Sequence, residues 1–208
     1  MCWRNLLMVV SRLTILVMVK KTKVNQILKP LEINPTQYYL GTGLHTLGLL
    51  GWILEQTGRA DVYVSTFSTS DAFLSGFHRL RKRGLINNAS LVADLKASKK
   101  TVQLYRIMQN CFDHVYLAQN HSKIVLVQND KYTVSVISSQ NQTYGDRAEC
   151  TMVTTSQEAF YELFCGLKHI VNDKSLELNG LFNRLTEKDR RESKGDDDPL
   201  GDIIPFGY

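Results

Sequence analysis

The sequence predicts an α/β protein in which helices layer a mixed β-sheet. Two observations predict this class. Short runs rich in β-branched and aromatic residues alternate with longer amphipathic segments, and two of the runs are joined by a short polar turn that makes an antiparallel hairpin. The 208 residues, 43% hydrophobic and 22% charged, have an ordinary globular composition. This composition excludes collagen, long disordered chains and polytopic membrane proteins.

The predicted helices are segments with apolar residues at helical spacing, bounded by residues that cap helices. Ser70 or Asp71 and, later, Ser156 can accept hydrogen bonds at helix N-termini, and Gly58 and Gly84 suit C-termini. In chain order the predicted helices span 43–58, 70–83, 99–111 and 156–171.

The predicted strands are runs of alternating or continuous apolar residues with many β-branched members. The last two flank the polar turn 128–131, so they are expected to pair as the hairpin. In chain order the predicted strands span 61–67, 89–95, 113–118, 123–127 and 132–138.

The predicted domain organisation is one α/β domain with two appendages. We assign 1–39 to an N-terminal extension and 40–182 to the domain. The charged segment 183–208 is expected to be a disordered tail. Met18 is a plausible alternative start, so residues 1–17 need not belong to the functional protein.

The N-terminal apolar stretch Leu6–Val19 raises the question of a membrane segment. It is 14 residues long with Arg12 inside it, whereas a spanning helix needs about 20. Lys20, Lys21 and Lys23 stand where a signal peptide would have small residues at its cleavage site. We therefore expect no stable membrane insertion and a cytoplasmic location.

The formal net charge of +5 conceals an uneven distribution. Residues 1–100 hold 14 Lys/Arg and 5 Asp/Glu, whereas 101–208 hold 11 and 15. A basic half suits an anionic partner such as nucleic acid, and the alternative is an ordinary solvated surface. Four basic residues near one predicted helix end could bind a phosphate backbone, or could simply stabilise the helix C-terminus: Arg79, Arg81, Lys82 and Arg83.

The cysteines and histidines give no metal-site spacing. The four cysteines stand far apart, and no histidine lies at ligand spacing from one of them. We expect reduced thiols, no metal site and no cofactor.

The sharpest local pattern is His121-Ser-Lys123 at the start of the hairpin, followed by Ser139 and Asn141 at its end. In an extended segment the imidazole and the ammonium share a face, because side chains alternate with period two. The hairpin returns the hydroxyl and the carboxamide beside them. Together these groups could hold a phosphoryl oxyanion and react with it, and Glu149 could orient the imidazole.

This order of residues resembles the phospholipase D superfamily, whose motif is His-x-Lys followed by Gly-Ser-x-Asn or Ser-Ser-x-Asn. The resemblance covers roughly 61–167 and is greatest to short bacterial and phage members with one motif copy, which resemble nucleases more than lipid hydrolases. It implies an α/β/α sandwich with helices on both faces of the sheet, and chemistry without a metal. It also implies that His121 forms a phosphohistidine, that Lys123 and Asn141 bind the phosphate, and that Ser139 and Glu149 complete the site.

The chain departs from this motif in two places. The aspartate expected seven residues after His121 is Gln128, and the first aspartate is Asp130. The stretch between Lys123 and Asn141 is also longer than usual. The main alternative to a nuclease is therefore a nucleic-acid-binding module of the same fold that has lost turnover. A lipid or headgroup hydrolase is disfavoured, because no membrane-active surface is evident beyond the N-terminus.

The chemistry needs two histidines, one to attack and one to protonate the leaving oxygen. His-x-Lys occurs once in this chain, whereas longer members of the superfamily carry two copies. One copy implies a C2 homodimer with both His121 side chains at the interface. The simplest alternative, a surface histidine and lysine on an edge strand with an asparagine capping a turn, explains each residue but not their joint order.

Overall fold

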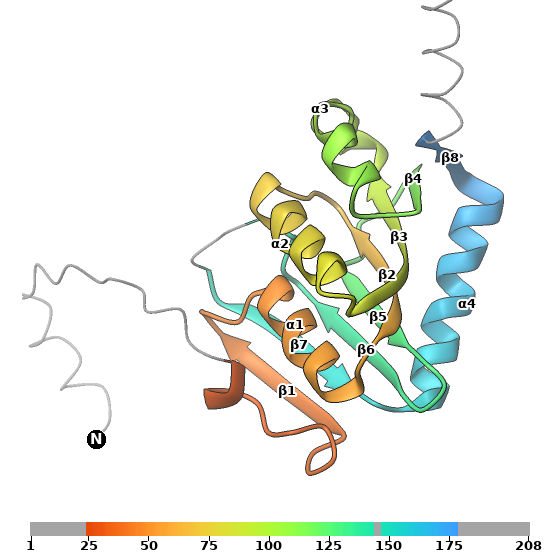
Figure 1. Ribbon diagram of the computed structural model, residues 1–208. Helices are drawn as coiled ribbons and strands as arrows, with labels where there is room; N and C mark the ends of the chain where they lie inside the picture. The colour runs from red at the N-terminus through yellow and green to blue at the C-terminus, as the bar shows by residue number, and fades with distance from the viewer. Residues whose placement is uncertain (1–23, 144–146, 179–208) are drawn as a thin grey trace, which may run out of the picture.

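The computed structural model describes residues 24–143 and 147–178 (Figure 1). Within these residues eight strands form one sheet in the order β1-β7-β6-β5-β2-β3-β4-β8. Neighbouring β2, β3 and β4 are parallel, and the other pairs are antiparallel, so the sheet is mixed. The strands are Thr36–Gly41 (β1), Ala60–Thr66 (β2), Ile86–Asp94 (β3), His114–Ala118 (β4), Ile124–Gln128 (β5), Thr133–Ser138 (β6), Glu149–Thr154 (β7) and Ser175–Glu177 (β8).

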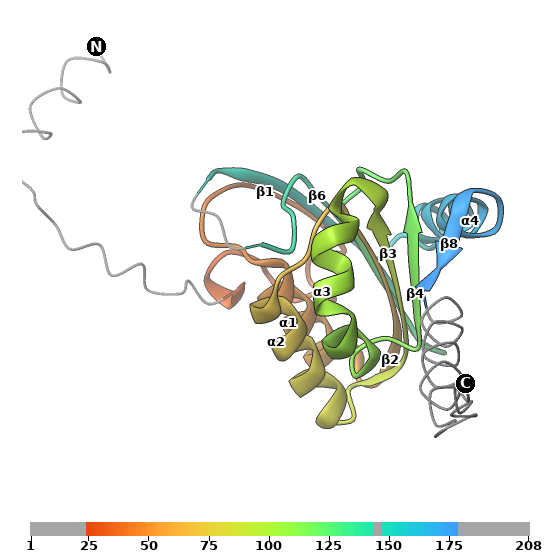
Figure 2. The ribbon, with the colours of Figure 1, turned by 90° about the horizontal axis from the view of Figure 1, so that it is seen from above.

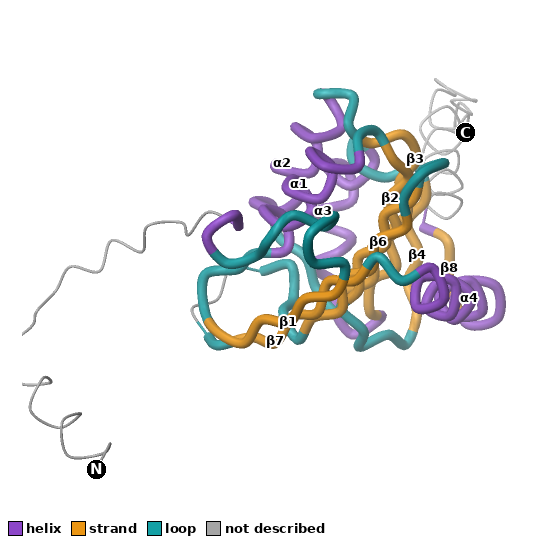
Figure 3. The backbone as a smooth tube through the Cα atoms, turned by 90° about the horizontal axis from the view of Figure 1, so that it is seen from below, coloured by secondary structure: helices purple, strands orange, loops and turns teal. Residues whose placement is uncertain are grey.

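Four α-helices lie on the two faces of this sheet. Figure 2 shows α1, α2 and α3 on one face and α4 on the other, and Figure 3 shows the same layers from the opposite side. The predicted fold class, a mixed sheet with helices on both faces, is confirmed. The helices are Thr46–Thr57 (α1), Asp71–Lys82 (α2), Ser98–Gln109 (α3) and Gln157–Lys174 (α4), with short 3-10 turns at Val24–Gln26 and Leu95–Ala97.

The main core lies between the sheet and α1, α2 and α3. Ile53 of α1 and Phe77 of α2 are fully buried there, against strand residues such as Val64. The α4 face has a smaller cluster around Val92 and Leu167. Burial of apolar area at about 25 cal/mol per Å² makes the first face the main source of stability. None of the helices in the described residues is both long and apolar enough to cross a bilayer.

The predicted helix caps are confirmed. Ser70 accepts a hydrogen bond from Phe73 N at 3.3 Å, and Ser156 accepts one from Ala159 N at 3.2 Å. Gly58 follows α1 with a φ of 79°, a left-handed conformation that glycine adopts without strain. These local signals fix the helix ends to within one to three residues of the prediction.

Three strands were not predicted, and one of them changes the expected domain boundary. β1 begins at Thr36, inside the segment 1–39 that we had assigned to an extension, and pairs along its length with β7. The polar segment after Ser138 contains β7 itself. The expected segment 1–17 and the expected tail 183–208 lie outside the described residues.

One edge of the sheet brings together the ends of several strands and helices. The register places the C-terminal ends of β2, β3 and β4 beside the start of β5 and the end of β6. The start of β7 lies at this edge too, as do the N-termini of α1 and α2, which follow β1 and β2. Ligands of open α/β sheets bind outside the carboxyl ends of the parallel strands, so this edge is the place to look for a site.

Candidate active site

His121 and Lys123 lie between β4 and β5, at this edge. The Lys123 ammonium donates to His121 Nδ1 at 3.1 Å and to the His121 carbonyl oxygen at 2.6 Å. An ammonium only donates, so Nδ1 is an acceptor here and the ring proton resides on Nε2. The exposed imidazole lies 5.1 Å from the ring of Phe67, which follows β2.

The Lys123 ammonium has a lowered pKa. Partial burial disfavours the charged form, and the carboxylates of Glu149 and Asp94 oppose this effect only in part. Both carboxylates therefore lie close enough to act on Lys123. Glu149 was predicted from the sequence, whereas Asp94 is a second carboxylate that the motif does not contain.

The hairpin returns its second strand beside Lys123, as predicted. Ser138 N donates to the Lys123 carbonyl oxygen at 2.9 Å, which places Ser139 directly after this contact. Ser139 Oγ donates to the carboxylate of Glu149 and accepts from Cys150 N at 3.0 Å. In this structure Glu149 therefore holds Ser139, rather than orienting the imidazole of His121 as we had expected.

Asn141 lies in a loop that is tied to two helix N-termini. Its neighbour Gln140 accepts from Thr46 N at 3.1 Å and from Thr46 Oγ1 at 3.2 Å, at the first residue of α1. On its other side Gln142 N donates to a carbonyl oxygen after β2, and Ser70 Oγ donates to Gln142 O at 2.8 Å. Asn141 is thereby positioned, and its Oδ1 is buried with no hydrogen-bond partner among the described residues.

Sequence reasoning missed two buried polar residues that build the His121 loop. Asp94, at the end of β3, accepts from Asn120 N at 2.8 Å and from Lys96 N at 2.7 Å. The Asn120 carboxamide donates to Ser65 Oγ at 2.9 Å and accepts from Ser122 Oγ at 2.7 Å. The available signal was a carboxylate at the C-terminal end of a predicted parallel strand, which is a usual position for functional groups.

The structure does not bring the whole basic cluster to the site. Arg81 pairs with Asp113 at 2.5 Å and Arg83 approaches Glu55 at 3.8 Å, near the end of α2 that is remote from Ser70. Lys82 stands beside them and is exposed. Arg79 alone of these four lines a pocket that Asn141 also lines.

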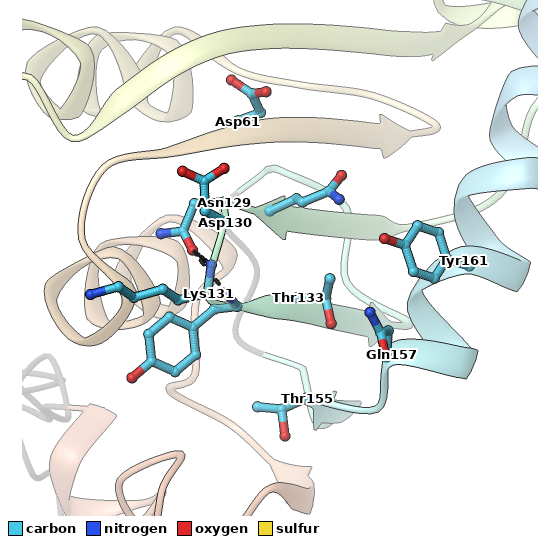
Figure 4. Close-up of a pocket in the computed structure, with 10 residues that line it drawn as sticks. Asp61, Asn129, Asp130, Lys131, Thr133, Thr155, Gln157 and Tyr161 are labelled. Atoms are coloured by element: carbon cyan, nitrogen blue, oxygen red, sulfur yellow. Dashed lines mark hydrogen bonds between the residues drawn. The ribbon is translucent and has the colours of Figure 1, made fainter.

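Gln128, at the position of the missing aspartate, lies at the opposite edge. It ends β5, about 14 Å from Ile124 at roughly 3.4 Å per residue. There it lines a polar pocket of about 710 Å³ together with Asp130 of the turn and Tyr161 of α4. Figure 4 shows this pocket among the hairpin turn, the start of β2 and α4. The residue at this position does not contact His121.

No protein-family model and no curated protein matches the sequence. Solved structures do match it. Polyphosphate kinase from Porphyromonas gingivalis is 13% identical over 65% of this chain and 26% of its own, with a TM-score of 0.48. Phosphatidylserine synthase from Haemophilus influenzae is 10% identical over 76% of this chain and 45% of its own, with a TM-score of 0.44. The chain thus spans about a quarter of the polyphosphate kinase and somewhat less than half of the phosphatidylserine synthase.

NucT from Helicobacter pylori, a nuclease of the phospholipase D superfamily, matches over nearly its entire length. The match covers 67% of this chain and 98% of NucT, at 12% identity and a TM-score of 0.51. The chain has a phospholipase D-like fold. This agrees with the resemblance seen in the sequence, and it is the fold alone that the match shows. In this phospholipase D-like chain the motif residues His121, Lys123, Ser139 and Asn141 come from both ends of one hairpin and lie at one edge of the sheet.

Proposed function

We propose that the protein is a phosphodiesterase that cleaves DNA or RNA through a phosphohistidine on His121, without a metal ion. The observation that carries the proposal is the pairing of Lys123 Nζ with His121 Nδ1 at 3.1 Å, with the Asn141 loop at the same edge. NucT, which shares the fold, is a nuclease. The basic first half of the chain suits a nucleic acid backbone.

The first half-reaction forms the bond between His121 and phosphorus. The phosphate oxygens draw the Lys123 ammonium away from Nδ1 and accept hydrogen bonds from it and from the Asn141 amide nitrogen. The ring proton then moves to Nδ1, so the Nε2 lone pair can attack phosphorus. The bond to the leaving oxygen breaks as that oxygen takes a proton from a second histidine ring in its protonated, imidazolium form, which becomes a neutral imidazole.

The second half-reaction returns the enzyme to its starting state. The imidazole that gave up its proton takes one from water, and the resulting hydroxide attacks phosphorus from the leaving-group side. The phosphorus–nitrogen bond breaks, the product carries a terminal phosphate, and His121 is free again.

A homodimer supplies the second imidazole in this proposal. The other histidines away from the site are engaged elsewhere: His78 with the Asn110 carbonyl, His114 with Glu177, and His169 with Asp173. The first two contacts lie away from the edge that carries His121, and the third is an exposed pair on the last turns of α4. His45, which precedes α1, does lie at this edge and lines the pocket beside Asn141. In this proposal the acid and then base is His121 of the partner subunit, brought to the interface by twofold symmetry.

The position of Gln128 favours the enzyme over a binding module that has lost turnover. The substitution of the motif aspartate lies at the far end of β5, at the hairpin turn. A change there leaves the groups around His121 in place.

The deciding experiment incubates purified protein with plasmid DNA, single-stranded DNA and RNA in the presence of EDTA. The proposal expects cleavage that survives chelation, disappears in His121→Ala and persists in the control His169→Ala, an exposed histidine on α4. Binding without cleavage under all conditions would mean a binding module. Cleavage that requires Mg²⁺ would contradict the phosphohistidine route, and turnover of phospholipid alone would indicate a lipid hydrolase.

A further inference from the structure

A pocket of about 420 Å³ opens beside Asn141, between the N-termini of α1 and α2. Its apolar walls include Leu47 and Phe73. This volume is typical of a site for a small molecule or part of one. Gln140 and Gln142 line both this pocket and the narrow crevice beside Lys123, so the pocket adjoins the proposed phosphate position.

Two carboxamides of the pocket have unused acceptors. Asn141 Oδ1 and Gln142 Oε1 are buried and receive no hydrogen bond from the described residues. The side chain of Gln142 is only 6% exposed, so solvent does not replace the missing donor. Gln140, equally buried, is bonded through its oxygen to Thr46. A buried carbonyl oxygen without a donor costs stability, and such exceptions are rare in native proteins. The two oxygens are therefore suited to a ligand that donates hydrogen bonds.

The chemistry of the pocket fits a nucleobase. A base has flat apolar faces for walls such as Leu47 and Phe73, and amino or ring N–H groups that donate to carboxamide oxygens. A lone anion would be repelled by the two oxygens, and an acyl chain would leave them unbonded. Exposed Arg79 at the rim suits the phosphate of the adjoining nucleotide. We propose that this pocket binds the base of a nucleotide next to the scissile phosphate, an assignment that rests on the proposed function.

The first test moves one abasic residue, position by position, along a short single-stranded oligonucleotide. Loss of the base at one position beside the cleaved bond should lower kcat/KM by about tenfold or more, because stacking and hydrogen bonding in the pocket are lost. Positions farther away should matter little. A uniform response along the strand would overturn the proposal.

The second test compares two neighbouring carboxamides of similar burial. Gln142→Leu removes an oxygen without a partner, so Tm should stay equal or rise while sensitivity to the abasic residue disappears. Gln140→Leu removes bonds to α1 and should lower Tm by a few degrees. A lower Tm in Gln142→Leu together with an unchanged abasic penalty would show a structural role only.

The third test does not depend on turnover. His121→Ala protein is titrated with AMP, CMP, ribose 5-phosphate and dihexanoylphosphatidylcholine. Binding of a nucleotide but not of ribose 5-phosphate supports the base pocket, provided that this binding is lost in the double variant with Gln142→Leu. This holds even if no nucleic acid is cleaved, because absence of cleavage would contradict the proposed function and not the base pocket. Equal binding of ribose 5-phosphate would indicate an anion site, and binding of the lipid alone a lipid site. Either result, or no nucleotide binding, overturns the proposal.

Discussion

At the scale of single residues, the motif could be predicted from the sequence, and the buried polar residues that hold the His121 loop could not. His121, Lys123, Ser139 and Asn141 lie at one edge because a hairpin joins them, which spacing could predict. Asp94 belongs to the same site through a parallel crossover, so no local spacing connects it to Lys123. Long-range pairing therefore decided the part of the site that sequence reasoning missed.

The pH dependence should report the protonation of Lys123. Its pKa lies below the ordinary value of 10.5 because burial disfavours the ammonium, and only the ammonium binds a phosphate oxygen. Activity should therefore fall on the alkaline side at a pH below 10.5. Lys123→Arg, which stays charged at high pH, should move this fall to higher pH in a profile of kcat/KM. An alkaline limb that is the same in both proteins would assign it to another group.

Asp94 is expected to act as a positioning residue. Asp94→Asn keeps an oxygen for Asn120 N but loses the charge that raises the pKa of Lys123. We expect the alkaline limb of the kcat/KM profile to move to still lower pH, with activity lost at alkaline pH because less of Lys123 stays charged. A loss of activity with an unmoved limb would mean that Asp94 only supports the fold.

At the scale of elements, the strongly patterned segments were predictable, and the strands β1 and β7 at one side of the sheet were not. The hairpin of β5 and β6 has β-branched runs around a polar turn, and it formed as predicted. β1 pairs with β7 at this side of the sheet and leaves the apolar side chains of Tyr38 and Leu40 exposed. The sequence of β7, ECTMVT, likewise lacks a regular alternation of apolar and polar residues. Their pairing depends on each other, which a scan along one segment does not detect.

The hairpin turn should matter for stability and not for catalysis. Asn129 Oδ1 accepts from Lys131 N and Tyr132 N. Its Nδ2 donates to the carbonyl oxygens of Thr57, the last residue of α1, and Arg59. Asn129→Ala should lower the free energy of unfolding by about 1–3 kcal/mol. Urea denaturation measures this, and activity per folded molecule should be unchanged. Asp130→Ala, in the same turn, serves as the matched control, and a loss of activity in either variant would place the turn in the site after all.

At the scale of the whole molecule, the layers explain why the proposed active site lies at one edge. The parallel strands, the returning hairpin and two helix N-termini all meet there, whereas the opposite edge carries the turn and the polar pocket of Figure 4. A site built at one edge by a single motif copy is half of the proposed active centre. The protein's activity should accordingly depend on its state of association.

Dilution tests this dependence. Sedimentation velocity should show a dimer, and specific activity should fall as the concentration passes below the dissociation constant. Heterodimers of wild type and His121→Ala should be inactive, since each centre would then hold one histidine. Full specific activity in a strict monomer would remove the two-histidine argument.

The hairpin also separates distance along the chain from distance in space. Residues 123 and 138 are neighbours across the strands, while Gln128 is remote although it is closer in sequence. Extra residues in the turn lengthen the interval between the two halves of the motif without moving either half. A fixed-interval pattern that demands an aspartate seven positions after the histidine would therefore reject chains whose histidine, lysine, serine and asparagine still lie at one edge.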